Sequence, residues 1–226
     1  MGEMIQFRAN GRDCPGYLAR ADRQDAPGVV VIQEYWGLEG EKSDVKAVGE
    51  RFAAAGYTAL APDLYHGEST SEPDEAGKLM MAMKIDEAAR DMRGAIGHLR
   101  DLTGKPVGIV GFCMGGALAL FAACENPDDV AACVDFYGGH PAIKYDLAAL
   151  KAPVLGLFGD QDDFATPDAA QELDRQLTAR GQEHSFTMYP GAGHAFFNRN
   201  RPEAYNPQAA EDAWSKVLAF FGQHLK

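Results

Sequence analysis

The chain of 226 residues lacks any long apolar run. Its longest, such as residues 27–32 and 106–110, are far shorter than the roughly 20 residues that a membrane-spanning helix needs. The first residues, Met-Gly-Glu-Met, contain neither the basic segment nor the apolar segment of a secretory signal. We therefore expect no membrane association.

Positive charge is scarce as well. The chain has 21 Lys and Arg against 33 Asp and Glu, a formal net charge of −12, and it has no basic tract. Nucleic acids and anionic membranes repel such a surface, because both are negatively charged. The composition therefore predicts that neither is a partner. We expect a small-molecule partner instead, and a monomer or small homo-oligomer.

Cysteine is sparse and scattered. The four cysteines are Cys14, Cys113, Cys124 and Cys133, and no two form a CxxC pair. This usage is typical of free thiols in a reduced compartment, so we expect a cytoplasmic protein. The chain also lacks an HExxH motif and a Cys/His cluster of the kind that binds zinc, so we expect no metal and no cofactor.

Apolar runs bounded by Gly and Pro alternate with helical patterns along the whole chain. Runs without polar alternation are typical of strands buried on both faces. The expected strands are 16–20, 28–33, 57–61, 107–112, 130–136, 154–158 and 184–189. The expected helices are 43–55, 75–102, 114–124, 166–180 and 207–224. The order predicts one α/β domain over residues 1–226, with a mainly parallel sheet covered by helices on both faces.

Ligands of such a sheet bind at the carboxyl ends of the strands. One strand-to-helix turn there reads Gly-Phe-Cys-Met-Gly-Gly, with Cys113 at its centre. This is the G-x-S-x-G nucleophile elbow with Cys in place of Ser. The turn is tight, so its neighbours must lack a Cβ atom. At a helix N-terminus we expect the dipole to lower the thiol pKa. The alternative is a buried structural cysteine beside a Gly-rich turn.

The thiol needs a base and an acid that orients it. His194 lies in the Gly-rich loop after the last expected strand and has little structural reason to be there. Asp162 and Asp163 follow the strand at 154–158, where they could also cap the next helix. The order Cys, Asp, His is that of α/β-hydrolases. We favour Asp162, which keeps a G-x-x-D spacing from Gly159.

The loop after residues 28–33 supplies the next candidates. An oxyanion hole needs two backbone N–H groups, and we expect them from Met114, which follows the nucleophile, and from Tyr35 in this loop. Glu34 stands directly behind a buried strand, where a carboxylate is costly unless it is paired. It is therefore a candidate catalytic residue, with plain loop surface as the alternative.

Four stretches together resemble the dienelactone hydrolase (carboxymethylenebutenolidase) family. They are GFCMGG at 111–116, Gln-Glu followed by an aromatic residue and Gly37, APDLY at 61–65 and GAGHAF at 191–196. The resemblance covers about residues 3–222 and implies an α/β-hydrolase fold with a Cys113, His194 and Asp162 triad. It also implies that Glu34 pairs with the resting thiol and helps to form the thiolate as substrate binds. Tyr35 and Met114 match the family's oxyanion donors.

The chain departs from the family at the two arginines that hold a substrate carboxylate. Gly67 and Asn198 occupy these positions, after His66 and before Arg199. The positions that we expect to bind substrate are Trp36, His66, Asn198 and Arg199, with Arg201 as a further replacement for the missing clamp.

The favoured function is hydrolysis of a small ester or lactone through an acyl-thioester on Cys113. The alternatives are a general carboxylesterase or thioesterase of other substrate scope, and a non-catalytic hydrolase-like module with a redox-sensitive thiol.

Overall fold

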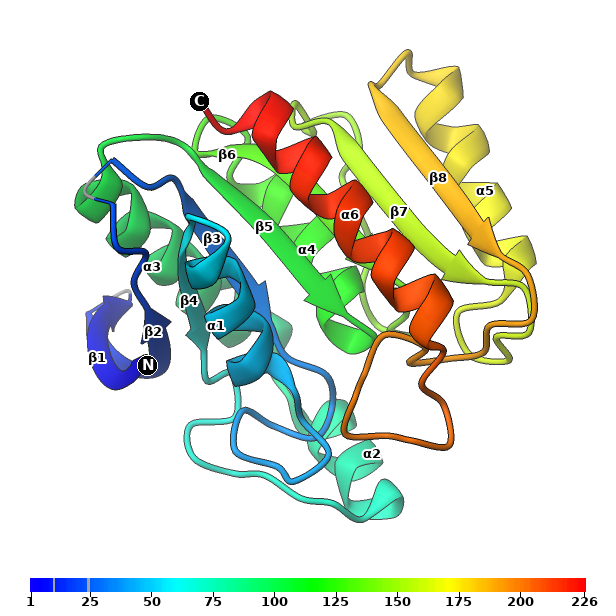
Figure 1. The fold of residues 1–226 in the computed structure, drawn as a ribbon, viewed down its shortest axis with the longest axis horizontal. Coiled ribbons are helices and arrows are strands. Elements are labelled where there is room, and N and C mark those ends of the chain that lie inside the picture. The colour runs from blue at the N-terminus through cyan, green and yellow to red at the C-terminus, as the bar shows by residue number, and fades with distance from the viewer. Residues whose placement is uncertain (10, 24) are drawn as a thin grey trace.

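The computed structural model describes residues 1–9, 11–23 and 25–226, and its centre is an eight-stranded sheet in the order β1-β2-β4-β3-β5-β6-β7-β8 (Figure 1). The strands are β1 (Glu3–Ala9), β2 (Arg12–Ala19), β3 (Gly28–Ile32), β4 (Thr58–Pro62), β5 (Val107–Phe112), β6 (Val130–Phe136), β7 (Val154–Gly159) and β8 (His184–Tyr189). Pairing is antiparallel from β1 to β2 and from β2 to β4, and parallel across the rest. The predicted α/β-hydrolase fold with a mainly parallel sheet is confirmed.

Helices cover both faces of this sheet. They are α1 (Val45–Ala54), α2 (Pro73–Ala82), α3 (Ile85–Thr103), α4 (Met114–Glu125), α5 (Pro167–Ala179) and α6 (Pro207–His224). Helices α1 and α6 lie on one face and α3, α4 and α5 on the other, while α2 lies beyond the carboxyl ends of the strands (Figure 1). Every residue of β3, β4, β5 and β7 is buried, which explains their unbroken apolar pattern.

One prediction about the elements is wrong, and one strand has no prediction. The helix expected over 75–102 is two helices, because Met83 and Lys84 adopt extended backbone between them. Apolar residues occur on both sides of the break, because both helices bury side chains. Helix α3 packs on the sheet, whereas α2 buries Met80 beyond the sheet. Strand β1 was not expected at all. It is an edge strand whose buried side chains are only Phe7 and Ala9, so its apolar signal is weak.

Within the described part of the chain, no helix combines the length and apolar character that crossing a membrane requires.

Candidate active site

Cys113 stands between β5 and α4 in a strained turn. Its backbone has φ 57° and ψ −123°, a positive φ that non-glycine residues rarely adopt. The turn closes because its neighbours are glycines. A Cβ on Gly111 would lie 1.8 Å from the carbonyl oxygen of Gly115, and one on Gly115 would lie 2.4 Å from that of Gln33. Glycine is therefore required at positions 111 and 115 by the close approach of backbone to backbone.

The Cys113 thiol is 5% exposed, and its pKa is raised rather than lowered. Burial is the largest cause, because it disfavours the charged thiolate, and the nearby Glu34 carboxylate adds to it. The Met114 backbone hydrogen bond acts in the opposite direction but is weaker. The direction of this shift contradicts the lowered pKa expected at the helix N-terminus and favours the protonated thiol.

His194 is held by Asp162. The Nδ1 atom of His194 lies 2.8 Å from Oδ2 of Asp162, whose side chain is fully buried. The other carboxylate oxygen accepts the backbone N–H groups of Phe164 and Ala165, each at 2.8 Å. These bonds fix the carboxylate, which in turn orients the imidazole. Asp163 is exposed and lies in a cavity wall, so the geometry favours Asp162 over its neighbour as the partner of His194.

The other ring nitrogen of His194, Nε2, is buried, and no hydrogen-bond partner is found for it among residues 1–9, 11–23 and 25–226. Most buried polar atoms in proteins are hydrogen-bonded, so an unpaired ring nitrogen beside a cavity calls for an explanation. The Nε2 atom is therefore free to exchange a proton with a group in the cavity.

Glu34 lies behind the cavity in a buried polar cluster. Its Oε2 accepts from Asn198 Nδ2 at 2.5 Å, and its Oε1 accepts from the Tyr137 hydroxyl at 3.5 Å. Burial, with a contribution from the charge of Asp44, raises the pKa of Glu34 to about 8, although the Asn198 bond opposes this. At neutral pH the Glu34 carboxyl is therefore mostly protonated.

The two expected oxyanion donors flank the nucleophile. Met114 directly follows Cys113, where its backbone N–H opposes the rise of the thiol pKa, and Tyr35 lines the same cavity as Cys113. Among the hydrogen bonds formed by the described residues, none is donated by the Tyr35 backbone N–H. Both groups are thus available to an oxygen placed beside the sulfur.

One cavity of about 390 Å³ contains the Cys113 thiol and the His194 ring. This volume lies in the range of small-molecule pockets. Its other lining residues are Tyr35, Met80, Gln161, Asp163, Phe164 and Arg201. Arg201 is the one cation among these lining residues. Its Nε donates to Glu203 at 2.9 Å, and its guanidinium lies 5.7 Å from the centre of the Trp36 ring.

The expected substrate-binding residues fall in different places. Asn198 is 1% exposed and uses its amide to hold Glu34 and the Lys42 carbonyl, rather than facing the cavity. Trp36 is buried behind Tyr35, with ring centres 4.3 Å apart. The Arg199 side chain is exposed. The backbone N–H of Arg199 donates to the Asp44 carboxylate, whose side chain forms no hydrogen bond that caps α1.

His66 belongs to a separate cluster between β2 and α3. Its Nε2 lies 2.8 Å from Asp91, and Cys14 completes a group whose three potential metal-ligating atoms lie within 4.8 Å of one another. The Arg12 guanidinium donates to Asp91 at 3.1 Å and lies 3.1 Å from the His66 ring. The ion pair with Arg12 already neutralises the charge of the Asp91 carboxylate. The attraction between these opposite charges holds the cluster together.

Sequence reasoning missed Tyr137, Met80 and Phe164. Tyr137 directly follows β6 with φ 41°, and its ring centre lies 5.1 Å from that of His194. Its place after a buried strand is the same signal that identified Glu34 and Cys113. No comparable signal exists for Met80, which reaches the cavity from α2, or for Phe164, whose orientation depends on the loop.

Comparisons with known proteins indicate one family. A family model described as the dienelactone hydrolase family matches residues 14–225. The chain is 36% identical over 231 residues to "Protein usf" of Aquifex pyrophilus and 33% identical over 232 residues to a "Putative carboxymethylenebutenolidase" of Aquifex aeolicus, with all of each chain covered. A crystal structure titled "Putative Dienelactone Hydrolase", from Klebsiella pneumoniae, superposes with a TM-score of 0.86 at 27% identity, covering 99% of both chains.

Proposed function

Because the chain belongs to the dienelactone hydrolase family, we propose that it hydrolyses a small ester or lactone with Cys113 as nucleophile and His194 as general base. Asp162 orients the histidine. The observation that carries the proposal is one cavity lined by both Cys113 and His194, with the far side of the imidazole bonded to a buried carboxylate. This is the nucleophile, base and acid arrangement of acyl-transfer enzymes.

In the first half-reaction the thiol proton passes to Nε2 of His194 and the sulfur attacks the carbonyl carbon. The N–H groups of Tyr35 and Met114 stabilise the oxyanion, and losing one such donor typically costs roughly 10²–10³ in rate. The carbon–oxygen bond then breaks, and the leaving alkoxide takes the proton from His194. An acyl-thioester on Cys113 remains, and in a lactone the alcohol stays attached to the acyl group.

In the second half-reaction a water molecule gives a proton to His194 and its oxygen attacks the thioester. The carbon–sulfur bond breaks, the carboxylic acid leaves, and Cys113 regains its proton. The buried Asp162 carboxylate stabilises the imidazolium that forms in both steps. Glu34, mostly protonated near neutral pH, places no full negative charge beside the forming thiolate.

The lining of the cavity supports a neutral substrate. A bidentate arginine clamp is charge-assisted and contributes on the order of 1.5–3 kcal/mol per hydrogen bond. Asn198 is engaged with Glu34, and the charge of Arg201 is balanced by Glu203. The net charge of −12 also disfavours anions at low salt. We expect kcat/KM for a neutral short-chain ester to equal or exceed that for the carboxylate-bearing dienelactone.

Steady-state kinetics with p-nitrophenyl esters and unsaturated lactones tests the proposal. Cys113→Ala should abolish hydrolysis while leaving the fold intact, since alanine fits the turn at least as well. Hydrolysis that survives this substitution contradicts the mechanism, and alkylation of Cys113 that blocks no ester hydrolysis favours the redox module. For the substrate, Arg201→Ala is compared with the matched surface variant Arg199→Ala. A strong dienelactone preference that disappears only in Arg201→Ala would establish a relocated clamp instead.

A further inference from the structure

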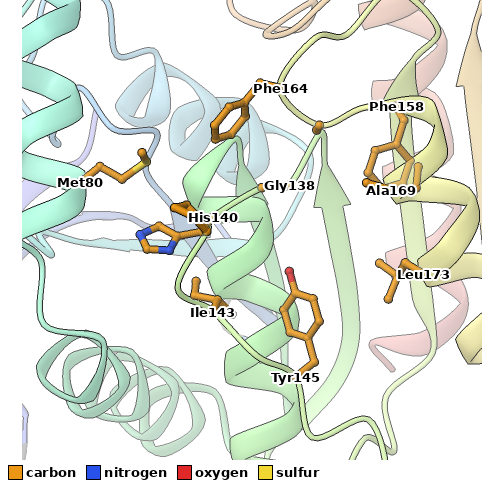
Figure 2. A pocket seen from close by; sticks show the side chains of 13 residues that line it. Met80, Gly138, His140, Ile143, Tyr145, Phe158, Phe164, Ala169 and Leu173 are labelled. Carbon is orange, nitrogen blue, oxygen red and sulfur yellow. The ribbon is translucent and has the colours of Figure 1, made fainter.

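A second cavity of about 430 Å³ lies beside the catalytic cavity (Figure 2). Met80 and Phe164 line both cavities, so the two are neighbours that share a wall. The catalytic cavity holds Cys113 and His194, while the second lies among α2, α5 and the segment that follows β6. A group attached to a substrate at Cys113 that passes Met80 and Phe164 would therefore enter the second cavity.

The chemistry of the second cavity is apolar. Figure 2 shows Met80, Ile143, Tyr145, Phe158 and Leu173 arranged around it. Its lining includes no Asp, Glu, Lys or Arg side chain. Such a wall offers dispersion contact and exclusion of water, but no full charge that would compensate a charged group for its lost hydration.

Two rings in this wall can change charge, those of Tyr145 and His140, and burial raises the pKa of Tyr145, which keeps its hydroxyl neutral. The Nδ1 of His140 accepts the backbone N–H of Ala142 at 3.1 Å, which requires an unprotonated Nδ1. Partial burial also lowers the pKa of His140, so the neutral ring is favoured. The cavity wall is therefore uncharged, and its polar side-chain groups among the described residues are the Tyr145 hydroxyl and the unpartnered Nε2 of His140.

Phe164 forms the boundary on the histidine side. Its side chain is an exposed large apolar group, 46% exposed, and its ring centre lies 5.1 Å from that of His194. A Cβ on Gly139 would lie 2.9 Å from the Phe164 ring, so the absence of a side chain there leaves room for the ring. The exposed ring of Phe164, between the two cavities, offers apolar surface that a ligand could cover.

From these contacts we infer that the second cavity is a substrate subsite for an uncharged apolar chain or ring of the ester. This inference rests on the proposed function, since it assigns the part of the substrate that does not react. It names a substrate class: esters with one small group and one apolar group of about four to eight carbons. The apolar group can be on the acyl side or on the alcohol side, and the kinetic series below separate the two.

The expected effect follows from burial of methylene groups. Each buried methylene is worth about 0.8 kcal/mol, a factor of roughly four in affinity. Four more methylenes would give a factor on the order of 10² if all were fully buried. We therefore expect kcat/KM to rise at least about tenfold from a two-carbon to a six-carbon group in one of the two series.

The experiment measures kcat/KM for acetate esters of ethanol to octanol and for ethyl esters of acetic to octanoic acid. Ala169→Trp places a bulky ring in the second cavity from α5, and Ala179→Trp adds the same ring to the same helix outside it. Within each protein we compare the ratio of kcat/KM for a long ester to kcat/KM for a short ester of the same series. It should fall below about threefold in Ala169→Trp and stay at the wild-type value in Ala179→Trp. Leu173→Trp is the second filling variant should the first fail to fold.

A binding measurement separates this inference from the proposed function. Methyl ketones from 2-butanone to 2-nonanone resemble the ester but have no leaving group, and calorimetry reads their binding without turnover. Affinity that rises with chain length in wild type and not in Ala169→Trp supports the subsite, even if Cys113 proves not to be the nucleophile. The inference is overturned if neither kcat/KM in the two ester series nor the affinity for the ketones rises with chain length. It is also overturned if the long-to-short ratio of kcat/KM keeps its wild-type value in both Ala169→Trp and Leu173→Trp.

Discussion

Replacing Glu34 with glutamine should change how stability depends on pH. Glutamine has nearly the same shape, so its side-chain oxygen can accept from Asn198 while its amide donates to the Tyr137 oxygen. The substitution therefore removes an ionisation without removing the cluster. The pKa of Glu34 is about 8 in the folded protein against an ordinary 4.5, because burial disfavours the carboxylate.

The sign follows from proton binding. Between pH 4.5 and about 8 the folded state holds a proton on Glu34 that the unfolded state has lost. The contribution is fully present below the unfolded pKa and is lost as pH rises through the folded pKa, at about 1.4 kcal/mol per pH unit. From pH 5.5 to 7.5 the wild type should thus lose up to ~2.7 kcal/mol through Glu34 alone. Relaxation around the ionised group reduces this, so we expect a difference of about 1.4–2.7 kcal/mol.

Urea unfolding at pH 5.5, 6.5 and 7.5 measures the effect as the difference in unfolding free energy between Glu34→Gln and wild type. Asp135 has a pKa raised by burial to about 7 and adds the same loss to both proteins, so its contribution cancels. Asp44, with a pKa raised by burial to about 6, adds a loss of the same sign to both, but its charge also raises the pKa of Glu34, so that coupling is part of the measured difference. The exposed Glu41→Gln is the matched control for the substitution itself. A Glu34→Gln protein that loses stability as steeply as wild type would refute the reasoning.

Further changes test the site and the turn. Cys113→Ser should lower kcat/KM by about 10²-fold or more, since a buried hydroxyl ionises far less readily than a thiol, and a serine variant as fast as wild type contradicts thiolate chemistry. Asp162→Asn should lower kcat by on the order of 10²–10⁴ through a wrongly oriented imidazole, whereas Asp163→Asn should be mild, and the reverse ranking would transfer the acid to Asp163. Gly111→Ala should prevent folding or lower the melting temperature sharply, because its Cβ meets backbone at 1.8 Å. Its control, Gly97→Ala, has open space within α3 and should add about 0.5–1 kcal/mol to the unfolding free energy.

Much of the site can be predicted from the sequence, because its parts are local signals at one edge of a parallel sheet. Cys113, Asp162 and His194 each follow an apolar strand pattern, and the carboxyl ends of parallel strands meet at the same edge. The glycines around Cys113 likewise follow from a turn that only the smallest residues can form. Short-range patterning therefore determined the fold class and the three candidate catalytic positions.

The tertiary structure decided what depends on burial and side-chain direction. Arg201, and not Arg199, lines the cavity, since the loop after His194 turns irregularly and no periodicity reports its direction. Asn198 holds Glu34, a pair separated by 164 positions that no spacing rule connects. The raised pKa of the Cys113 thiol has the same origin. Its helix position suggests a thiolate, but desolvation by distant parts of the chain outweighs the dipole, and only the folded packing determines how much water reaches the sulfur.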